Sequence, residues 1–271
     1  MKRWIKLVAV LCLLAVLAGC RHEKQIELVW EMEAQDVLTL PDGESVDAWR
    51  SRSVPAHSGA ETLPSNAVDY RLSDGTELLR EKDLPDVELP EDTPDAARKA
   101  IRSYYNEQGR LYDVKELLQS AYTAWQADKK HFSEWYVEQS TYTTAQNEKL
   151  LWLCTEQVLP AASQESTATY TSVIFDRTTG EQMDVWSLFR VSEDEAKAAL
   201  LRTVQDDAER AALLQVLKAE WVIFYPDHVE VCFPAGSVEG QSLDLQVATD
   251  LSELTDILQT WAVPQAETTE E

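Results

Sequence analysis

The sequence predicts an α+β protein in which an antiparallel sheet of several strands is packed on one face by helices. Residues 169–189 read as a strand, a tight turn and a return, because bulky and polar residues alternate up to Asp176 and Gly180 supplies the positive φ of a short reversal. Two upstream segments, 93–109 and 113–125, instead carry apolar residues at helical spacing. Helices followed by consecutive strands with short polar connections are typical of a sheet covered on one face.

The first twenty residues have the layout of a bacterial lipoprotein signal. Lys2, Arg3 and Lys6 precede an apolar run that is too short to span a bilayer comfortably, and the run ends in Leu-Ala-Gly-Cys at Cys20. These last four residues resemble the lipobox, which implies cleavage before Cys20 and attachment of acyl chains to it. We therefore expect anchoring to the extracytoplasmic face of a cell membrane through Cys20. An ordinary secretion signal with a chance cysteine and an uncleaved anchor are the alternatives.

Four regions are expected along the chain. A signal peptide (1–19) is followed by an anchor and stalk (20–88), in which prolines and glycines interrupt the pattern and the Asp-Gly pair at 74–75 marks a short β-hairpin. Residues 89–260 are expected to form the α+β domain. Residues 261–271 are expected to be an acidic, disordered tail.

The main domain is expected to begin with two helices and a three-stranded meander. Thr93 is predicted to cap a helix that ends at Gly109, and Asp113 is predicted to cap the next helix. The period then changes from helical to alternating. The expected strands are 135–144, 150–158 and 169–176.

The C-terminal third of the chain is expected to contain further helices and a hairpin. Ser192 and Glu195 have the spacing of a capping box, and the apolar pattern slips near 206–207, which predicts two short helices or one bent helix. The remaining expected elements are a hairpin over 221–225 and 229–233, a strand over 243–248, and a closing helix through Leu251, Leu254 and Leu258.

The chain is strongly acidic, with 48 Asp and Glu against 24 Lys and Arg and a net charge of −24. Three of the basic residues and none of the acids precede Cys20, so the mature chain would carry −27. Such a charge repels phosphate groups, which argues against nucleic acid or an anionic lipid surface as partner and favours cationic proteins or peptides. A surface that is merely soluble would have the same charge.

Two cysteines besides Cys20 belong to the mature chain, namely Cys154 and Cys232, and both lie in expected strands. Outside the membrane such a pair can oxidise to a disulfide. Strand cysteines are also common as simple buried apolar residues. The sequence leaves both alternatives open.

Short motifs of enzyme active sites are absent from the sequence, including the nucleophile elbow, the zinc-protease motif and the phosphate-binding loop. His22 and His57 lie in the anchor and stalk, and His131 and His228 lie at the edges of expected elements. We interpret all four as solvated or hydrogen-bonding side chains, and we expect no metal, no cofactor and no enzymatic activity. A hydrolase that uses two carboxylates in a cleft is the remaining catalytic alternative.

The phrases 173–176, 179–180 and 186–189, followed by a helix and the hairpin at 221–233, resemble a known domain of unknown function. This domain forms the C-terminal end of RsiV-type lysozyme-sensing anti-sigma factors and of PdaC-type peptidoglycan deacetylases. The resemblance covers about residues 89–258. It departs from the family at 166–171, where STATYT stands in place of the Gly-Gly-Ala-His segment of many members. An anti-sigma region, a transmembrane helix and a deacetylase domain are also missing, so the resemblance implies neither signalling nor deacetylation.

These observations predict a lipid-anchored extracytoplasmic binding protein. The charge and the resemblance imply a cationic protein as ligand, such as a lysozyme-like muramidase or an antimicrobial peptide. A cell-wall accessory that contacts peptidoglycan or its enzymes is the alternative.

Overall fold

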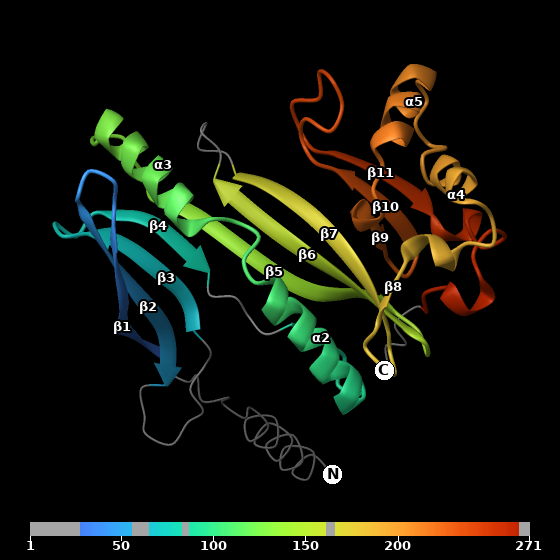
Figure 1. Ribbon diagram of the computed structural model, residues 1–271, viewed down its shortest axis with the longest axis horizontal. Coiled ribbons are helices and arrows are strands. Elements are labelled where there is room, and N and C mark those ends of the chain that lie inside the picture. Colours follow the sequence, from blue (N-terminus) through green and yellow to red (C-terminus); the bar gives the residue numbers. More distant parts are fainter. Residues whose placement is uncertain (1–27, 56–64, 83–86, 161–165, 266–271) are drawn as a thin grey trace, which may run out of the picture.

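The computed structural model describes residues 28–55, 65–82, 87–160 and 166–265, which form an α+β architecture with two sheets (Figure 1). The large sheet has eight strands whose spatial order is their order in the chain. Its strands are β1 (Leu28–Thr39), β2 (Ser45–Pro55), β3 (Ser65–Leu72), β4 (Glu77–Lys82), β5 (Trp135–Gln146), β6 (Leu150–Pro160), β7 (Ser166–Asp176) and β8 (Gln182–Met183). Neighbouring strands are antiparallel except for β4 and β5, which pair in parallel. The predicted fold class is confirmed.

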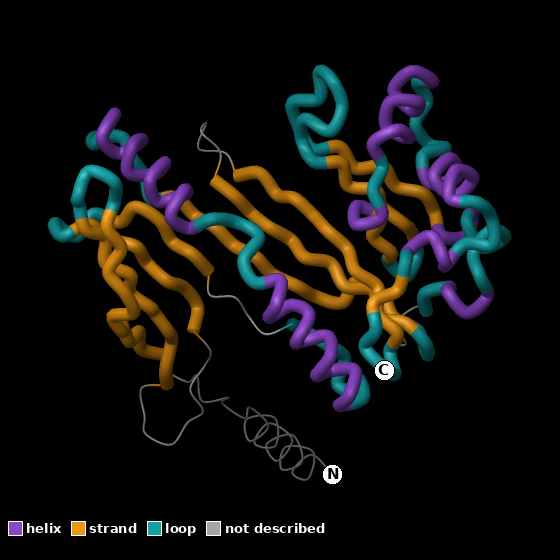
Figure 2. Tube along the Cα trace, viewed as in Figure 1, coloured by secondary structure: helices purple, strands orange, loops and turns teal. Residues whose placement is uncertain are grey.

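The small sheet and the described helices complete the fold (Figure 2). The predicted hairpin is confirmed, and it forms a sheet of its own with the predicted last strand, in the order β11-β10-β9. Its strands are β9 (Val222–Phe224), β10 (His228–Phe233) and β11 (Leu245–Asp250), and the helices are α2 (Asp95–Gln108), α3 (Val114–Ala127), α4 (Glu193–Leu200) and α5 (Asp207–Val216). The slip in the apolar pattern therefore corresponds to two short helices, α4 and α5.

The expectation of a loose stalk with a short hairpin is wrong for residues 28–82. They form the long strands β1 to β4, and the predicted hairpin is the β3–β4 pair, in which Gly75 has a φ of +87°. Val46 and Leu79 of this region are fully buried. The turn residues at 41–43, which contributed to the expectation of a loose stalk, instead close a hairpin, since Gly43 donates to the carbonyl of Leu40 and Leu40 donates to that of Glu44.

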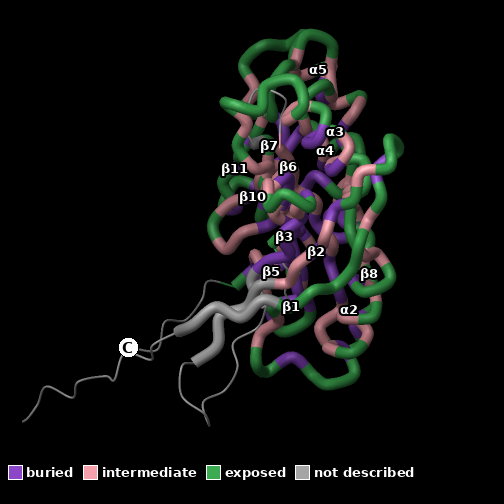
Figure 3. Tube along the Cα trace, turned by 90° about the vertical axis from the view of Figure 1, so that its left-hand side faces the viewer, coloured by how far each residue is buried: buried purple, intermediate pink, exposed green. Residues whose placement is uncertain are grey.

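The middle of the large sheet is the central layer of three. Alternate residues of a strand face opposite sides, and on β6 Leu151 and Leu153 pack with Ile101 of α2. On the opposite side Trp152 packs against Phe224 of the small sheet, with ring centroids 5.8 Å apart. Buried positions follow the strands, whereas the outer loops are exposed (Figure 3). The sheet therefore has helix α2 on one face and the small sheet on the other.

Helix α3 packs against the N-terminal strands rather than beside α2. Its buried residues Leu118, Ala121 and Tyr122 share a cluster with Leu78 and Leu79 of β4. The order along the chain is thus β1–β4, α2, α3 and β5–β7. Helix α2 covers β5–β7, which follow it, and α3 covers β1–β4, which precede it. The two halves of the sheet are consecutive in the sequence, but the helices that cover them come in the opposite order.

Two of the three predicted helix caps are confirmed. The Asp113 carboxylate accepts from the N–H groups of Lys115 and Glu116, and Ser192 forms a complete capping box with Glu195. The prediction for Thr93 is wrong. Pro94 is the N-cap of α2, while Thr93 is only 4% exposed.

The predicted closing helix is wrong. Its segment begins with the short 3₁₀ turn η3 (Leu251–Glu253) and continues as turns, and a second 3₁₀ turn, η4 (Thr260–Ala262), follows it. Its three leucines are buried as expected, but the backbone bonds to other segments: Leu251 N–H donates to the Asp227 carbonyl at 2.8 Å and Gln259 N–H donates to the Leu188 carbonyl at 2.7 Å. From the sequence alone, a buried irregular segment with leucines at this spacing has the same apolar pattern as a helix.

Candidate functional site

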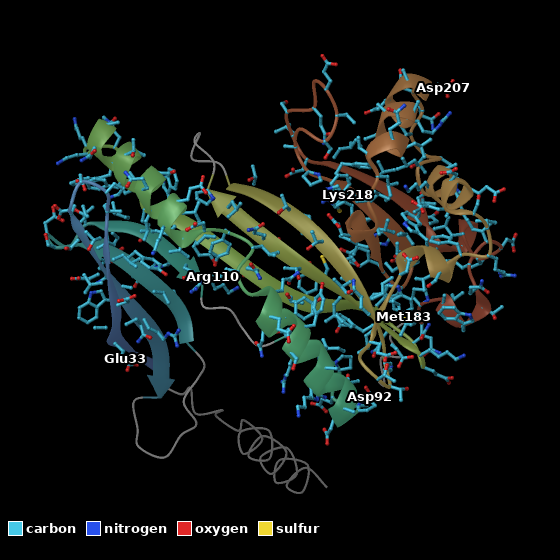
Figure 4. The ribbon with its side chains drawn as sticks, viewed as in Figure 1. Glu33, Asp92, Arg110, Met183, Asp207 and Lys218 are labelled. Carbon is cyan, nitrogen blue, oxygen red and sulfur yellow. The ribbon has the colours of Figure 1, made fainter. Side chains whose placement is uncertain are left out.

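A groove of about 340 Å³ runs along the outer edge of β7. One wall is the C-terminal half of α2, with Tyr104 and Gln108, and the other is the 3₁₀ turn η2 (Ala219–Trp221) that leads into β9. The floor is the stretch 171–174 of β7, and Met183 of β8 lies at one end. Figure 4 shows Met183 where β8 meets β7, and Lys218 beside the small sheet.

The floor of the groove is an unpaired strand edge. Within the described residues β7 pairs with β6 along its length, and on its other side only Ile174 and Phe175 pair with β8. Alternate residues of an antiparallel strand direct their N–H and C=O groups away from a given neighbour. The backbone N–H of Asp176 points away from β6, since it donates to the Glu181 carbonyl at 2.9 Å. By the same alternation Ser172 and Tyr170 present outward N–H and C=O groups.

Two polar side-chain atoms of the groove are buried and have no hydrogen-bond partner among the described residues. They are the Ser172 hydroxyl on the floor and the Gln108 carbonyl oxygen on the α2 wall. Ser172 is only 7% exposed. Buried polar groups are normally satisfied, because leaving one unpaired costs about 1–3 kcal/mol. The groove therefore holds hydrogen-bonding capacity that the fold itself does not use.

The charged residues that line the groove are Glu220 and Asp184, and the lining contains no Lys, Arg or His. Lys218, next to the lining, forms an exposed ion pair with Glu220 at 3.7 Å, and the Asp184 carboxylate accepts from the Trp186 N–H at 3.2 Å. Burial raises the pKa of Tyr104 above its ordinary value, and the negative charge of Glu220 raises it further, which places that carboxylate within electrostatic reach of Tyr104. Further along β7, the Tyr170 hydroxyl donates to Glu156 at 3.2 Å. Burial and this carboxylate raise the pKa of Tyr170 to about 12. The surroundings of the edge are therefore acidic.

The structure brings Cys154 and Cys232 together, as the disulfide alternative requires, but both are free thiols. They share a small buried cluster with Ile223 between the two sheets. Burial is the main cause that raises the pKa of each thiol to about 12. Their environment is that of buried apolar residues. Cys20, the predicted lipidation site, lies outside the described residues.

The two described histidines lie far apart in the chain and each contacts carboxylates. His131 is exposed and its Nδ1 is 2.8 Å from Asp128 Oδ2. His228 stacks on Tyr225 and contacts Asp227 at 2.6 Å and Glu230 at 3.2 Å. The other two predicted side chains, His22 and His57, lie outside the described residues. The part of the chain that is described holds no group of three or more His, Cys, Asp or Glu arranged for a metal ion.

The groove was not identified as a site from the sequence, although its floor belongs to the strand on which the fold prediction was based. Its residues carry no reactive group, and an open strand edge depends on which strands become neighbours. The one available signal was the segment 166–172, which has small, hydroxyl-bearing residues on both faces. No helix in the described ranges has the length and apolar character needed to cross a bilayer.

Comparisons with known proteins give structural neighbours only. No protein-family model and no curated protein matches the chain. A DUF3298 family protein from Pseudomonas aeruginosa PAO1 is 13% identical with a TM-score of 0.36, over 89% of this chain and 98% of that one. A DUF3298 member from Bacteroides fragilis NCTC 9343 is 8% identical with a TM-score of 0.43, over 86% of this chain and 94% of that one. The structural neighbours thus belong to an uncharacterised domain family, and the RsiV-type resemblance stays a prediction.

Proposed function

We propose that the protein is a lipid-anchored binding protein of the extracytoplasmic face that captures a cationic protein, with lysozyme as the model ligand. The observation that carries the proposal is the acidic groove at the open edge of β7, whose charged lining is Glu220 and Asp184. The net charge of −24 adds long-range attraction for a basic partner. Anchoring follows from the lipobox-like end of the leader at Cys20.

A binding measurement tests the proposal. The chain from Glu23 to Glu271, which retains every described residue, is titrated with hen-type lysozyme and with a neutral protein of similar size, at low and at physiological salt. Saturable one-to-one binding of lysozyme that survives physiological salt is expected, because a specific interface keeps contacts that screening does not remove. Binding that vanishes with salt, or that occurs equally with any basic protein, would mean that the negative charge belongs to an ordinary solvated surface and to no specific binding site.

Charge-neutral variants locate the interaction. Glu220→Gln combined with Asp184→Asn removes both groove carboxylates, and Asn can still cap the 3₁₀ turn η1 (Val185–Leu188) that Asp184 begins. Asp207→Asn combined with Glu209→Gln removes the same charge from α5, away from the groove (Figure 4). The groove variant is expected to bind lysozyme about tenfold more weakly, whereas the α5 variant retains most of the affinity.

Cosedimentation with purified cell-wall sacculi separates this function from that of a cell-wall accessory. The acidic surface predicts no binding to anionic wall polymers, because like charges repel. Retention on sacculi without binding to lysozyme would favour the accessory instead.

A further inference from the structure

We infer that the ligand segment binds as an added β-strand on the open edge of β7. The occupant is an extended segment of a cationic protein, with basic side chains on alternate positions. This inference rests on the proposed function and specifies how the groove would perform it.

The geometry of the edge supports strand addition. The two strand pairs on the outer side of β7 are Ile174–Met183 and Phe175–Gln182, so β8 already occupies the line that an added strand would continue. Beyond this point Ser172 offers outward N–H and C=O groups within the groove, and Tyr170, two residues on, offers the next pair where β7 approaches residues 232–234 and 244–246. At about 3.3 Å per residue, these positions match the spacing of alternate residues on an incoming strand. Main-chain hydrogen bonds supply affinity in this mode of recognition.

The walls of the groove supply side-chain contacts. The unpartnered Ser172 hydroxyl and Gln108 carbonyl oxygen lie on the floor and on the α2 wall, within the same groove. Successive side chains of an added strand point to opposite faces, so one set would face α2 and the other would face η2. A lysine or arginine of the added strand would compete with the exposed Lys218 for Glu220 on the η2 side, and near β8 it would share the Asp184 carboxylate with the Trp186 N–H.

Charge distinguishes this occupant from a second copy of the chain. Two copies paired edge to edge would bring their acidic grooves together at a net charge of −24 each, which is unfavourable. A basic strand neutralises the same groups. The edge is therefore suited to a cationic partner rather than to self-association.

The test uses two peptides of equal charge on the chain from Glu23 to Glu271. The first is an eight-residue peptide of alternating lysine and valine with blocked ends, and the second has the same sequence with every backbone nitrogen methylated, so that it keeps the charge but cannot donate to a strand pair. The alternating peptide is expected to bind at least about tenfold more tightly, since it alone can donate main-chain hydrogen bonds. Equal binding of both peptides would overturn strand addition but leave capture by charge intact.

Residue-resolved amide exchange provides a position-specific test that needs no variant. The alternating peptide is expected to slow exchange at Tyr170 and Ser172, whose N–H groups point outward. The amides of Thr171 and Val173, which face β6, should change little. Uniform slowing along β7, or no change at Ser172 while the peptide is bound, would overturn the assignment.

A pair of variants at one position completes the test. Ser172→Pro removes the outward N–H at a strand edge, where proline is tolerated, and Ser172→Ala removes only the hydroxyl. Loss of peptide binding in Ser172→Pro with an unchanged melting temperature, and a smaller loss in Ser172→Ala, are expected. A dimer of the free chain in light scattering that the peptide fails to dissociate would assign the edge to a second copy. Binding of lysozyme without binding of the alternating peptide would overturn strand addition alone, whereas loss of both would overturn the proposed function.

Discussion

Arg110 forms an ion pair with the buried carboxylate of Glu81. Arg110 Nη2 donates to Glu81 Oε2 at 3.1 Å, and its Nε donates to the other oxygen. The hydroxyls of Tyr70 and Tyr112 donate to the same carboxylate at 2.8 and 2.7 Å. The Glu81 side chain is 1% exposed, whereas Arg110 is 46% exposed and lies in the connection between α2 and α3 (Figure 4). The pair fixes this connection to β4, where the two halves of the large sheet meet.

Replacement of Glu81 by alanine is expected to lower the free energy of unfolding by about 3–5 kcal/mol. The change leaves Tyr70 and Tyr112 without their acceptor and Arg110 without its counter-charge. Urea unfolding followed by circular dichroism measures the loss. The control is Glu138→Gln on the neighbouring strand, which breaks the more exposed pair with Lys82 and should cost under about 1 kcal/mol. Equal losses in the two variants would contradict a special role for Glu81.

Gly180 is expected to tolerate no side chain, because its turn packs directly on α2. A Cβ at this position would lie 2.7 Å from the Ala97 carbonyl oxygen and 2.8 Å from the Ala100 Cβ, and its φ is +74°. Gly180→Ala therefore combines backbone strain with a clash and should cost about 2–5 kcal/mol. Gly75 has a φ of +87°, but a Cβ at this position would meet open space. Gly75→Ala should therefore lower the free energy of unfolding by only about 1–2 kcal/mol. Thermal unfolding of both variants gives the comparison.

His228 is expected to make stability depend on pH. Burial opposes its charged form, but the hydrogen bonds to Asp227 and Glu230 outweigh burial and raise the pKa of His228 above its ordinary value. A raised pKa in the folded state means that the stabilisation is fully present below about pH 6.5 and is lost as pH rises through the folded value. His228→Gln should therefore be less stable than the parent at pH 5, by under about 1 kcal/mol, and the difference should shrink at pH 9. A difference that is independent of pH would exclude the mechanism.

The thiols of Cys154 and Cys232 are expected to be unreactive in the folded chain. Burial raises the pKa of both to about 12, so almost no thiolate exists at pH 8. In the chain from Glu23 to Glu271, Ellman's reagent should react slowly until guanidinium unfolds the protein, and then with both thiols. Cys232→Ser is the control, in which only one thiol should react after unfolding. An unfolded parent chain in which no thiol reacts would show a disulfide.

A fragment limited to residues 89–260 is expected not to fold stably. It contains α3 but lacks β1–β4, so Leu118, Ala121 and Tyr122 would lose the cluster in which they are buried. Size-exclusion chromatography and urea unfolding of this fragment, compared with the chain from Glu23 to Glu271, measure the effect. A monomeric fragment with a cooperative transition would show that the C-terminal half is independent.

Local signals in the sequence predicted most elements of the fold. The capping residues Asp113 and Ser192, the Asp-Gly turn at 74–75 and the alternation in 135–176 depend on interactions between near neighbours, which the sequence displays directly. The closing helix failed because Leu251, Leu254 and Leu258 are buried by other segments, and burial alone does not require a helix.

Long-range relationships could not be predicted in the same way. The parallel β4–β5 pair joins residues more than fifty positions apart, and nothing local marks it. The groove depends on the absence of a neighbour for most of β7, which is a property of the whole sheet. Glu81 reads as one of 48 acids, and only its tertiary partners distinguish it.

The exchanged order of the two covering helices constrains when the chain can fold during synthesis. The strands β1 to β4 emerge from the ribosome first, but the helix that buries their face ends only at Ala127. Helix α2 emerges before every strand that it covers. The strands β1–β4 therefore lack their covering helix until α3 is made, and α2 lacks its strands until β5–β7 are made. No early portion of the chain contains all the residues of a core. A nascent chain of this kind keeps the apolar face of β1–β4 exposed until α3 has been made, which gives a chaperone or an export machine an interval in which to hold it unfolded.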